Sequence, residues 1–318
     1  MIDPASRRAV GNTGVTVSRL GIGGGSSFMR AEGETGLLVD AAWQEGLRHF
    51  DTAPLYGNGE SEKRLGRALS PYPRDALVLS TKAGREAARA GARAFDYSAS
   101  GIRSSILRSC GRMQTDRIDL AFIHDVDPDM HVSFEARFAE AVDEAYGALD
   151  ALRVEGIIRA IGIGLKDWDV ALRFAKEAPL DCIMLAGGYT LLQHGALHDL
   201  LPWCEANRVG VMLAAPFNSG ILASGAIDGA RYFYAPAPPE ILERTRRIDA
   251  VCARHHVPLA AAALQFPLHH PAIVSVVVGQ ERAREVQENT RLLSTPIPTA
   301  MWAELKEQRL IPAEAPAG

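Results

Sequence analysis

The chain has 318 residues, of which 47% are hydrophobic and 23% are charged, and its formal net charge is -4. This length suits either one large α/β barrel or two ordinary domains, and the composition is that of a soluble globular protein. A slightly acidic chain without blocks of like charge argues against a nucleic acid or an anionic membrane as partner, and it favours a small molecule.

The cysteines and the N-terminus bear on where the protein acts. The four cysteines are scattered without a CxxC pair, which is typical of reduced thiols in a cytosolic protein. Residues 1–8 lack the apolar core of a signal peptide, and no apolar run reaches the length of a membrane span. We therefore expect a cytoplasmic protein, and the sequence leaves its oligomeric state open.

Two short strand-like runs around an Asn/Gly turn, within residues 8–17, predict an N-terminal β-hairpin. After it, apolar strand-like runs alternate with helical patterns. Strands are expected at residues 20–23, 47–51, 77–82, 119–124, 160–164, 182–185, 210–214 and 273–279. Helices are expected at residues 34–45, 61–69, 98–112, 134–155, 168–177, 196–207, 239–255, 259–266, 283–292 and 300–309.

Strands that lack clear alternation and are each followed by a helix are typical of a parallel barrel. The expected fold class is therefore α/β, a (β/α)8 TIM barrel with an N-terminal β-hairpin. We expect residues 1–318 to form a single domain, with 311–318 as a flexible tail. The segment 224–239, rich in Gly, Pro and aromatic residues, is expected to be an irregular loop that acts as a substrate or cofactor flap.

Residues 50–60 carry most of the chemical information. A short apolar run ends in Asp51, and Tyr56 follows in a Pro- and Gly-rich loop. The next two predicted strands end in Lys82 and His124. Because the carboxyl ends of barrel strands meet at one end of the barrel, we expect these four side chains to converge.

This set of residues suits proton transfer coupled to hydride transfer. A tyrosine has a pKa of about 10 in water and needs nearby positive charge to act near neutral pH. We expect Lys82 to lower the pKa of Tyr56, and Asp51 to hold Lys82 in place. His124 is expected to hydrogen-bond the oxygen of a carbonyl or alcohol.

Each of these residues also has a purely structural explanation when taken alone, such as a loop cap for Asp51 or a satisfied core histidine for His124. Ionisable groups at the ends of three consecutive buried strands favour the catalytic interpretation. His194 and His198 stand four residues apart, but no third ligand is apparent nearby, so no metal site is expected.

The glycine-rich run at residues 21–26 does not complete a dinucleotide fingerprint, because its third glycine is missing. Asp40, at about the right distance for the acidic partner, falls inside a predicted helix rather than at a strand end. We expect Gly23 and Gly24 to let the first barrel loop pass close to a ligand instead.

From the hairpin to the final helix, the chain resembles the aldo-keto reductase superfamily. The resemblance rests on Asp-Thr-Ala with Tyr-Gly within 51–57, Gly-Glu-Ser-Glu at 59–62, Ser-Thr-Lys at 80–82 and Ile-His at 123–124. It implies a barrel that uses a nicotinamide cofactor, with Tyr56 as the acid/base. It also implies that Lys82 and Asp51 tune Tyr56, and that His124 orients the substrate oxygen.

Further blocks are similar to bacterial aldose 1-dehydrogenases of the D-threo-aldose or L-fucose type, and to L-galactose and pyridoxal 4-dehydrogenases. These blocks lie at residues 95–98, 116–125, 188–192, 216–222 and 261–267. The resemblance implies oxidation of the anomeric hydroxyl of a free aldose to a lactone. Pyridoxal oxidation, general aldehyde or carbonyl reduction and a cofactor-binding regulatory subunit remain as alternatives.

The cofactor that the resemblance implies is NAD rather than NADP. Members that prefer NADP often have a basic residue at the position of Gly279 and an arginine at the position of Glu285. A carboxylate would repel a 2′-phosphate but can accept a hydrogen bond from a free ribose hydroxyl. The cofactor contacts implied are Gly23, Gly24, Phe217, Ser219, Gly279, Gln280, Glu285, Glu288 and Asn289.

The chain departs from the superfamily where many members hold the nicotinamide ring. Polar residues that grip its carboxamide are replaced by Gly164, Leu165 and Ala186, and Ala214 replaces an aromatic that stacks on the ring. We expect Asn218 or Lys166 to substitute for these contacts.

Overall fold

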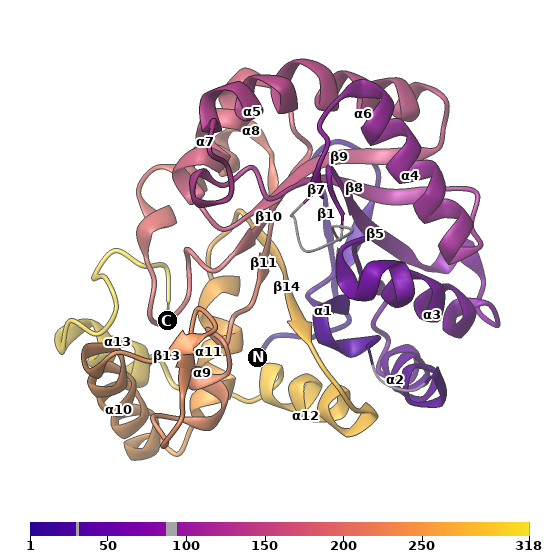
Figure 1. Cartoon of the computed structure of the whole chain (residues 1–318). Coiled ribbons are helices and arrows are strands. Elements are labelled where there is room, and N and C mark those ends of the chain that lie inside the picture. The colour runs from indigo at the N-terminus through magenta and orange to yellow at the C-terminus, as the bar shows by residue number, and fades with distance from the viewer. Residues whose placement is uncertain (30–31, 87–93, 318) are drawn as a thin grey trace.

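The computed structural model describes residues 1–29, 32–86 and 94–317, and its centre is a closed barrel of eight parallel strands (Figure 1). Seven of the strands follow one another around the barrel in chain order, and β14 pairs with both β11 and β3 to close it. The structure confirms the predicted TIM barrel. The strands are β3 (Leu20–Gly23), β4 (His49–Asp51), β5 (Val78–Ala83), β8 (Ile118–His124), β9 (Ile158–Leu165), β10 (Cys182–Ala186), β11 (Gly210–Ala214) and β14 (Ile273–Gly279).

Helices surround the barrel and cover the outer faces of its strands (Figure 1). Between β8 and β9, two helices are joined by a π-helical turn, Ala141–Ala145, within the span predicted as one helix. The helices are α1 (Gly24–Ser27), α2 (Glu32–Gln44), α3 (Glu60–Leu69), α4 (Ala99–Met113), α5 (Phe134–Glu140), α6 (Tyr146–Val154), α7 (Trp168–Glu177), α8 (Leu200–Asn207), α9 (Ile221–Ser224), α10 (Pro239–Arg254), α11 (Leu259–Leu268), α12 (Ala283–Leu293) and α13 (Thr299–Glu307).

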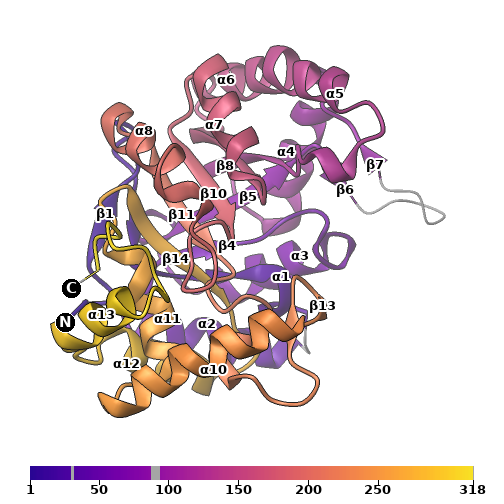
Figure 2. The same ribbon diagram turned by 90° about the vertical axis from the view of Figure 1, so that its left-hand side faces the viewer.

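The predicted N-terminal hairpin is present and consists of β1 (Arg7–Ala9) paired with β2 (Thr16–Ser18). Its valines Val10, Val15 and Val17 are buried against side chains of the barrel interior, including Phe122 and Met184. Figure 2 shows β1 and both termini at one end of the barrel, while β6 (Arg85–Glu86) and β13 (Ala235–Pro236) lie at the other. The hairpin therefore fills one end with apolar groups and leaves the opposite end for polar ones.

Three segments differ from their predicted form. The helix predicted from residue 196 begins as a short 3-10 turn, Gly195–Leu197, and α8 starts only at Leu200. The segment predicted as an irregular loop, 224–239, contains a small antiparallel pair, β12 (Arg231–Tyr232) with β13. In the chain end predicted as a flexible tail, 311–318, Ile311, Ala315 and Ala317 pack against the core, and the Lys306 ammonium donates to the carbonyl of Ala317 at 2.8 Å; residue 318 lies outside the described residues.

In the part of the chain that the structure describes, no helix combines the length and the apolar character needed to cross a bilayer.

Packing of α3 against α4 depends on a glycine, and this leads to a stability prediction. A Cβ at Gly66 would lie 2.4 Å from the carbonyl oxygen of Met113, which is backbone and cannot rotate away. Gly66→Ala should therefore lower the free energy of unfolding by about 1–3 kcal/mol, measured by urea denaturation. Gly111→Ala is the matched control, because its Cβ meets nothing within 4 Å and should stabilise α4 by up to about 1 kcal/mol. Equal stability of the two variants would contradict the packing argument.

Candidate active site

The four predicted catalytic side chains lie together at the carboxyl ends of three adjacent strands. Asp51 ends β4, Lys82 lies in β5, and His124 ends β8. Tyr56 opens a short turn, Tyr56–Gly59, in which Gly57 and Gly59 adopt positive φ angles of 58° and 84°. These left-handed residues turn the chain sharply between β4 and α3, which explains the glycines of this loop.

A buried ion pair links the first two of these residues. Lys82 Nζ lies 2.6 Å from Asp51 Oδ2 and donates a second hydrogen bond to the carbonyl of Thr52 at 2.8 Å. The other oxygen of Asp51 accepts from the Ser80 hydroxyl at 2.8 Å, and Ser80 in turn lies 3.0 Å from His49 Nε2. Burial lowers the pKa of Lys82, but Asp51 and Tyr56 more than reverse this, so its net pKa is raised and the ammonium stays charged.

The Tyr56 ring lies close to this ammonium, with Lys82 Nζ 4.9 Å from the ring centroid. The sequence predicted that Lys82 lowers the pKa of Tyr56. The net direction is the opposite: burial raises the pKa of Tyr56, and the lowering by Lys82 does not fully compensate. The predicted lowering by Lys82 is present, but the prediction omitted the cost of removing a phenolate from water, and this cost sets the net direction.

His124 faces Tyr56 edge-on, with ring centroids 6.3 Å apart and an interplanar angle of 88°. Burial lowers the pKa of His124 to about 4, so the imidazole is neutral near neutral pH. Its Nε2 lies 3.5 Å from Asp125 Oδ2, which also forms an ion pair with Arg85. A neutral imidazole can donate a hydrogen bond to a substrate oxygen without adding a charge.

Asp125 follows His124 in an unusual backbone conformation, with φ at 56°. Its carbonyl is fixed by Tyr97 Oη at 3.0 Å and His131 Nε2 at 3.0 Å, and Tyr97 Oη also donates to the carbonyl of His124 at 2.8 Å. Its N–H donates to the carbonyl of Gly164 at 2.8 Å. A strained residue held by several neighbours is a common feature of functional sites.

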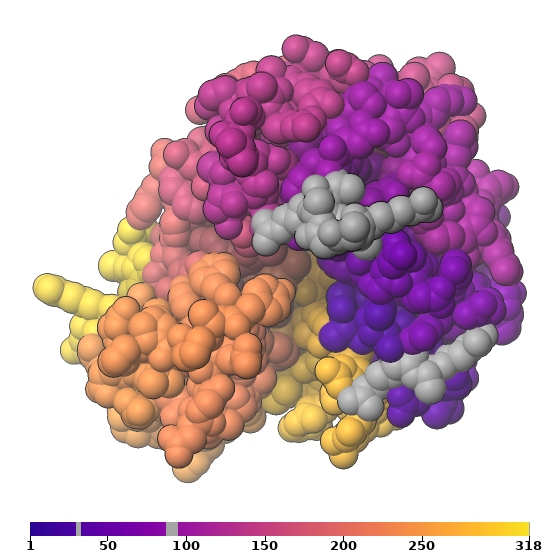
Figure 3. Space-filling view, viewed as in Figure 1, coloured from indigo at the N-terminus to yellow at the C-terminus, as the bar shows by residue number. Residues whose placement is uncertain are grey.

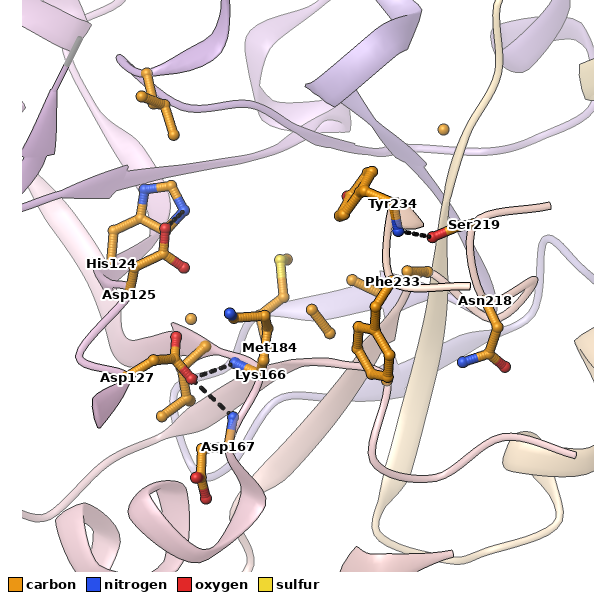
Figure 4. Close-up of a pocket in the computed structure, with 18 of the residues that line it drawn as sticks. His124, Asp125, Asp127, Lys166, Asp167, Met184, Asn218, Ser219, Phe233 and Tyr234 are labelled. Carbon is orange, nitrogen blue, oxygen red and sulfur yellow. Dashed lines mark hydrogen bonds and ion pairs between the residues drawn. The ribbon is translucent and has the colours of Figure 1, made fainter. Parts of the chain in front are cut away.

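These residues open into a cavity of about 1310 Å³, above the range of about 300–1,000 Å³ common for small-molecule sites. The surface is hollowed there, near the centre of the ring of helices (Figure 3). Figure 4 shows His124, Asp125 and Asp127 along one side of the cavity, and Phe233, Tyr234 and Asn218 along the opposite side. The volume has room for a dinucleotide beside a small substrate.

Comparison with known proteins agrees with this geometry. Residues 19–309 match the aldo/keto reductase family. The chain belongs to that family. It is 42% identical to a D-threo-aldose 1-dehydrogenase from Pseudomonas sp, and the match covers 98% of each chain. It is 35% identical to a pyridoxal 4-dehydrogenase from Microbacterium luteolum, and that match covers 96% of this chain and 98% of the relative. The holo form of an aldo-keto reductase from Bacillus halodurans superposes with a TM-score of 0.81 at 25% identity, covering 98% and 97%. The protein is therefore an oxidoreductase of small molecules that uses a nicotinamide cofactor.

The described residues of this aldo/keto reductase fit such a cofactor. Among the predicted contacts, Phe217, Ser219 and Gly279 line the cavity. Within the described chain, the buried amide of Gln280 has no hydrogen-bond partner for its oxygen or nitrogen. A Cβ at Gly279 would lie 2.8 Å from Ser26 Oγ, so this position is kept open by the glycine. The open backbone at Gly279 leaves room for a dinucleotide, whereas Gln280 lies behind it and is not among the residues that line the cavity.

The remaining predicted contacts lie at the same end of the barrel or beside it. Gly23 pairs in register with both Asp51 and Gly279, so it sits between the catalytic strand and the cofactor loop. Gly24 follows it at the start of α1, where a Cβ would lie 2.5 Å from the carbonyl of Asp51. On α12, Glu285 accepts a hydrogen bond from the Glu281 N–H at 2.7 Å, Asn289 is buried, and Glu288 is exposed.

The positions that replace the usual nicotinamide contacts, Gly164, Leu165, Ala186 and Ala214, all line the cavity. The two expected substitutes, Asn218 and Lys166, line it as well. Asn218 donates from Nδ2 to Gln193 Oε1 at 2.9 Å, while its own buried oxygen has no partner among the described residues. The Lys166 ammonium is held by Asp129 at 3.0 Å. Of the two, Asn218 retains an unused polar atom for a ligand.

Three polar residues of the cavity, Asp125, Asp127 and Arg85, were not predicted individually, although the loop 126–133 that contains Asp127 was expected to influence substrate choice. The two aspartates directly follow the predicted strand that ends in His124, and this position was a usable signal. Arg85 follows the strand of Lys82 in the same way. Only the fold shows that Arg85 reaches across to pair with Asp125, because forty residues separate them.

The buried histidines of the site predict a pH-dependent stability. Burial lowers the pKa of His49 and of His124 to about 4, below the ordinary value of 6.5. The two histidines bind protons more readily in the unfolded chain than in the folded one. Their contribution to the free energy of unfolding is therefore fully present above about pH 6.5 and is lost as the pH falls towards 4. Each histidine should contribute a loss on the order of 2 kcal/mol between about pH 7 and about pH 5.

Urea denaturation near these two pH values, on the wild type and on His49→Gln, tests this dependence. The variant should show a smaller loss of stability on acidification, whereas His198→Gln, which removes an exposed histidine, should behave as the wild type does. An unchanged loss in His49→Gln would show that His49 does not titrate as the structure requires.

Proposed function

We propose that this enzyme oxidises the anomeric hydroxyl of a free aldose of the L-fucose, D-arabinose or L-galactose type to the lactone, with transfer of hydride from C1 to NAD+. The observation that carries the proposal is the match over nearly the full length of both chains to a D-threo-aldose 1-dehydrogenase, combined with a cavity that contains Tyr56, Lys82 and His124. The polar wall around His124 suits a substrate with several hydroxyl groups.

The geometry of the side chains supports the following roles. His124, neutral and facing Tyr56, hydrogen-bonds the anomeric oxygen and orients it. Tyr56 accepts the proton of that hydroxyl as a phenolate, which burial disfavours and which the Lys82 ammonium stabilises. Asp51 keeps Lys82 charged and aimed. The nicotinamide ring, when bound, supplies the hydride acceptor.

A second function, oxidation of pyridoxal, is supported by the pyridoxal 4-dehydrogenase to which the chain is 35% identical. General reduction of aldehydes or carbonyls would use the same side chains in the reverse direction. The 42% identity to the aldose 1-dehydrogenase favours a sugar over both.

A substrate screen separates these functions. The wild-type enzyme is incubated with NAD+ or NADP+ and with L-fucose, D-arabinose, L-galactose, L-xylose, other aldoses and pyridoxal, and the absorbance of the reduced nicotinamide is followed. We expect turnover with aldoses that share one stereochemical pattern. Activity on pyridoxal without activity on any sugar, or activity in the reductive direction alone, would refute the aldose proposal and leave the catalytic residues in place.

Preference for NAD over NADP is the second part of the proposal, and it is supported by Glu285 and by the absence of a basic side chain at Gly279. The Glu285 carboxylate accepts a hydrogen bond from the Glu281 N–H, and this bond holds the Glu285 side chain next to the loop that follows β14. Its charge would repel a 2′-phosphate.

Glu285→Arg should therefore shift the ratio of kcat/KM for NAD+ to that for NADP+ roughly tenfold towards NADP+, because a change of about 1.4 kcal/mol in binding is a factor of ten. Glu240→Arg, the same charge change on exposed α10, is the control and should leave the ratio unchanged. A wild-type enzyme that prefers NADP+ would contradict the assignment.

A further inference from the structure

Asp127 is a buried carboxylate that the catalytic scheme does not use. It lies in the loop after β8, three residues beyond His124, and is 1% exposed. Its Oδ1 accepts hydrogen bonds from the backbone N–H groups of Lys166 and Asp167, at 3.0 and 2.8 Å. Its Oδ2 is also buried and has no hydrogen-bond partner in the described parts of the chain.

The structural task of Asp127 needs only one of its oxygens. Oδ1 alone receives both N–H groups and so connects the loop after β8 to the start of α7. An asparagine could do the same, because its amide oxygen also has two acceptor positions. The second carboxylate oxygen is therefore not explained by the fold, and a buried acceptor without a donor carries a free-energy cost.

Among the residues that the structure describes, no cation forms an ion pair with this carboxylate, although the charge of Lys166 acts on it from a distance. The Lys166 ammonium, on the adjacent strand end, pairs with Asp129 at 3.0 Å. The Arg85 guanidinium pairs with Asp125. Burial raises the pKa of Asp127 to about 6, with Asp125 adding to the effect, so most of the group is still ionised at pH 7 and can accept a hydrogen bond.

Asp127 is one of the residues that line the reaction chamber, and its Oδ2 is buried just beneath the chamber surface. It lines the same cavity as Tyr56, Lys82 and His124. In Figure 4 it lies on the side that carries His124 and Asp125, opposite the aromatic side chains of Phe233 and Tyr234. A substrate whose oxygen meets His124 would extend its other groups along one of these two walls, one polar and one aromatic.

We infer that Asp127 Oδ2 accepts a hydrogen bond from a hydroxyl group of the aldose other than the one that reacts, and that it is a specificity-determining residue of the substrate site. The inference rests on the proposed function. A hydroxyl donor would satisfy the buried oxygen, whereas a substrate lacking that hydroxyl would leave it unpaired. A site built around a hydroxyl rejects analogues that lack it far more strongly than an apolar pocket rejects an added group.

The test combines a change in the enzyme with a change in the sugar. The kcat/KM of wild type and of Asp127→Asn is measured for the best aldose and for its monodeoxy analogues, each lacking one hydroxyl other than the anomeric one. In the wild type, loss of one particular hydroxyl should lower kcat/KM by roughly 10- to 100-fold, as expected for a hydrogen bond to a charged group. In Asp127→Asn an amide NH2 donor replaces the acceptor Oδ2, so kcat/KM for the parent sugar should fall, and removal of the same hydroxyl should lower kcat/KM by a smaller factor than in the wild type.

Two controls separate this role from a structural one. Asp169→Asn makes the same change on the exposed surface of α7, outside the cavity, and should keep the wild-type dependence on every hydroxyl. The KM for NAD+ and the thermal midpoint of Asp127→Asn should stay near those of the wild type. If Asp127→Asn does not fold, Asp127→Ser takes its place, because a serine hydroxyl can still accept from one of the two N–H groups.

Each outcome bears on the inference. An identical hydroxyl dependence in wild type and variant would overturn it, as would an equal loss for all sugars accompanied by a large drop in the thermal midpoint. A wild-type enzyme that oxidises no aldose would refute the proposed function, and this inference with it. If the wild type oxidises aldoses and Asp127→Asn does so with the same kcat/KM, the inference alone would be refuted.

Discussion

The ion pair between Lys82 and Asp51 is the interaction on which the rest of the site depends. Two charges are held 2.6 Å apart in a place that water barely reaches. Removing such charges from water costs several kcal/mol for each ion, and only good geometry with further hydrogen bonds offsets this. Here Thr52 and Ser80 supply those bonds, and His49 supports Ser80 from the barrel interior.

The barrel makes this geometry possible. β4 and β5 are parallel neighbours, and Asp51 lies opposite Ser80. Lys82, two residues after Ser80, is therefore the next side chain on the same face of β5 towards the carboxyl end. The N-terminal hairpin fills the opposite end with valines, which leaves this end as the place where polar groups can meet solvent and ligands. β8 then contributes His124 and the following aspartates to the same rim. The catalytic groups and the polar wall therefore share one rigid support.

The periodic parts of this structure could be predicted from the sequence. The barrel strands and most helices were found within a few residues, because buried parallel strands form continuous apolar runs and helices alternate with them. Asp51, Lys82 and His124 could be placed at strand ends by the same argument. Tyr56 was found because its loop is marked by proline and glycine.

The parts that depend on three-dimensional surroundings could not be predicted. The pKa of Tyr56 is a balance between burial and the Lys82 charge, and a sequence shows the charge but not the burial. The left-handed conformation of Asp125 and its pairing with Arg85 join segments that are distant in the chain. The short hairpin within 224–239 and the packed residues after 310 are stabilised by tertiary contacts, which local propensity does not describe.

The most direct test of the central claim is the fate of the hydrogen at C1. L-Fucose, or the best aldose found, is labelled with deuterium at C1 and incubated with NAD+, and the reduced nicotinamide is analysed by mass spectrometry for wild type and Tyr56→Phe. The account predicts deuterium in the cofactor and a lactone product for the wild type. For the variant, it predicts a rate lower by at least about 100-fold with nearly unchanged binding of NAD+. Unlabelled reduced cofactor from the wild type, or normal turnover by Tyr56→Phe, would contradict it.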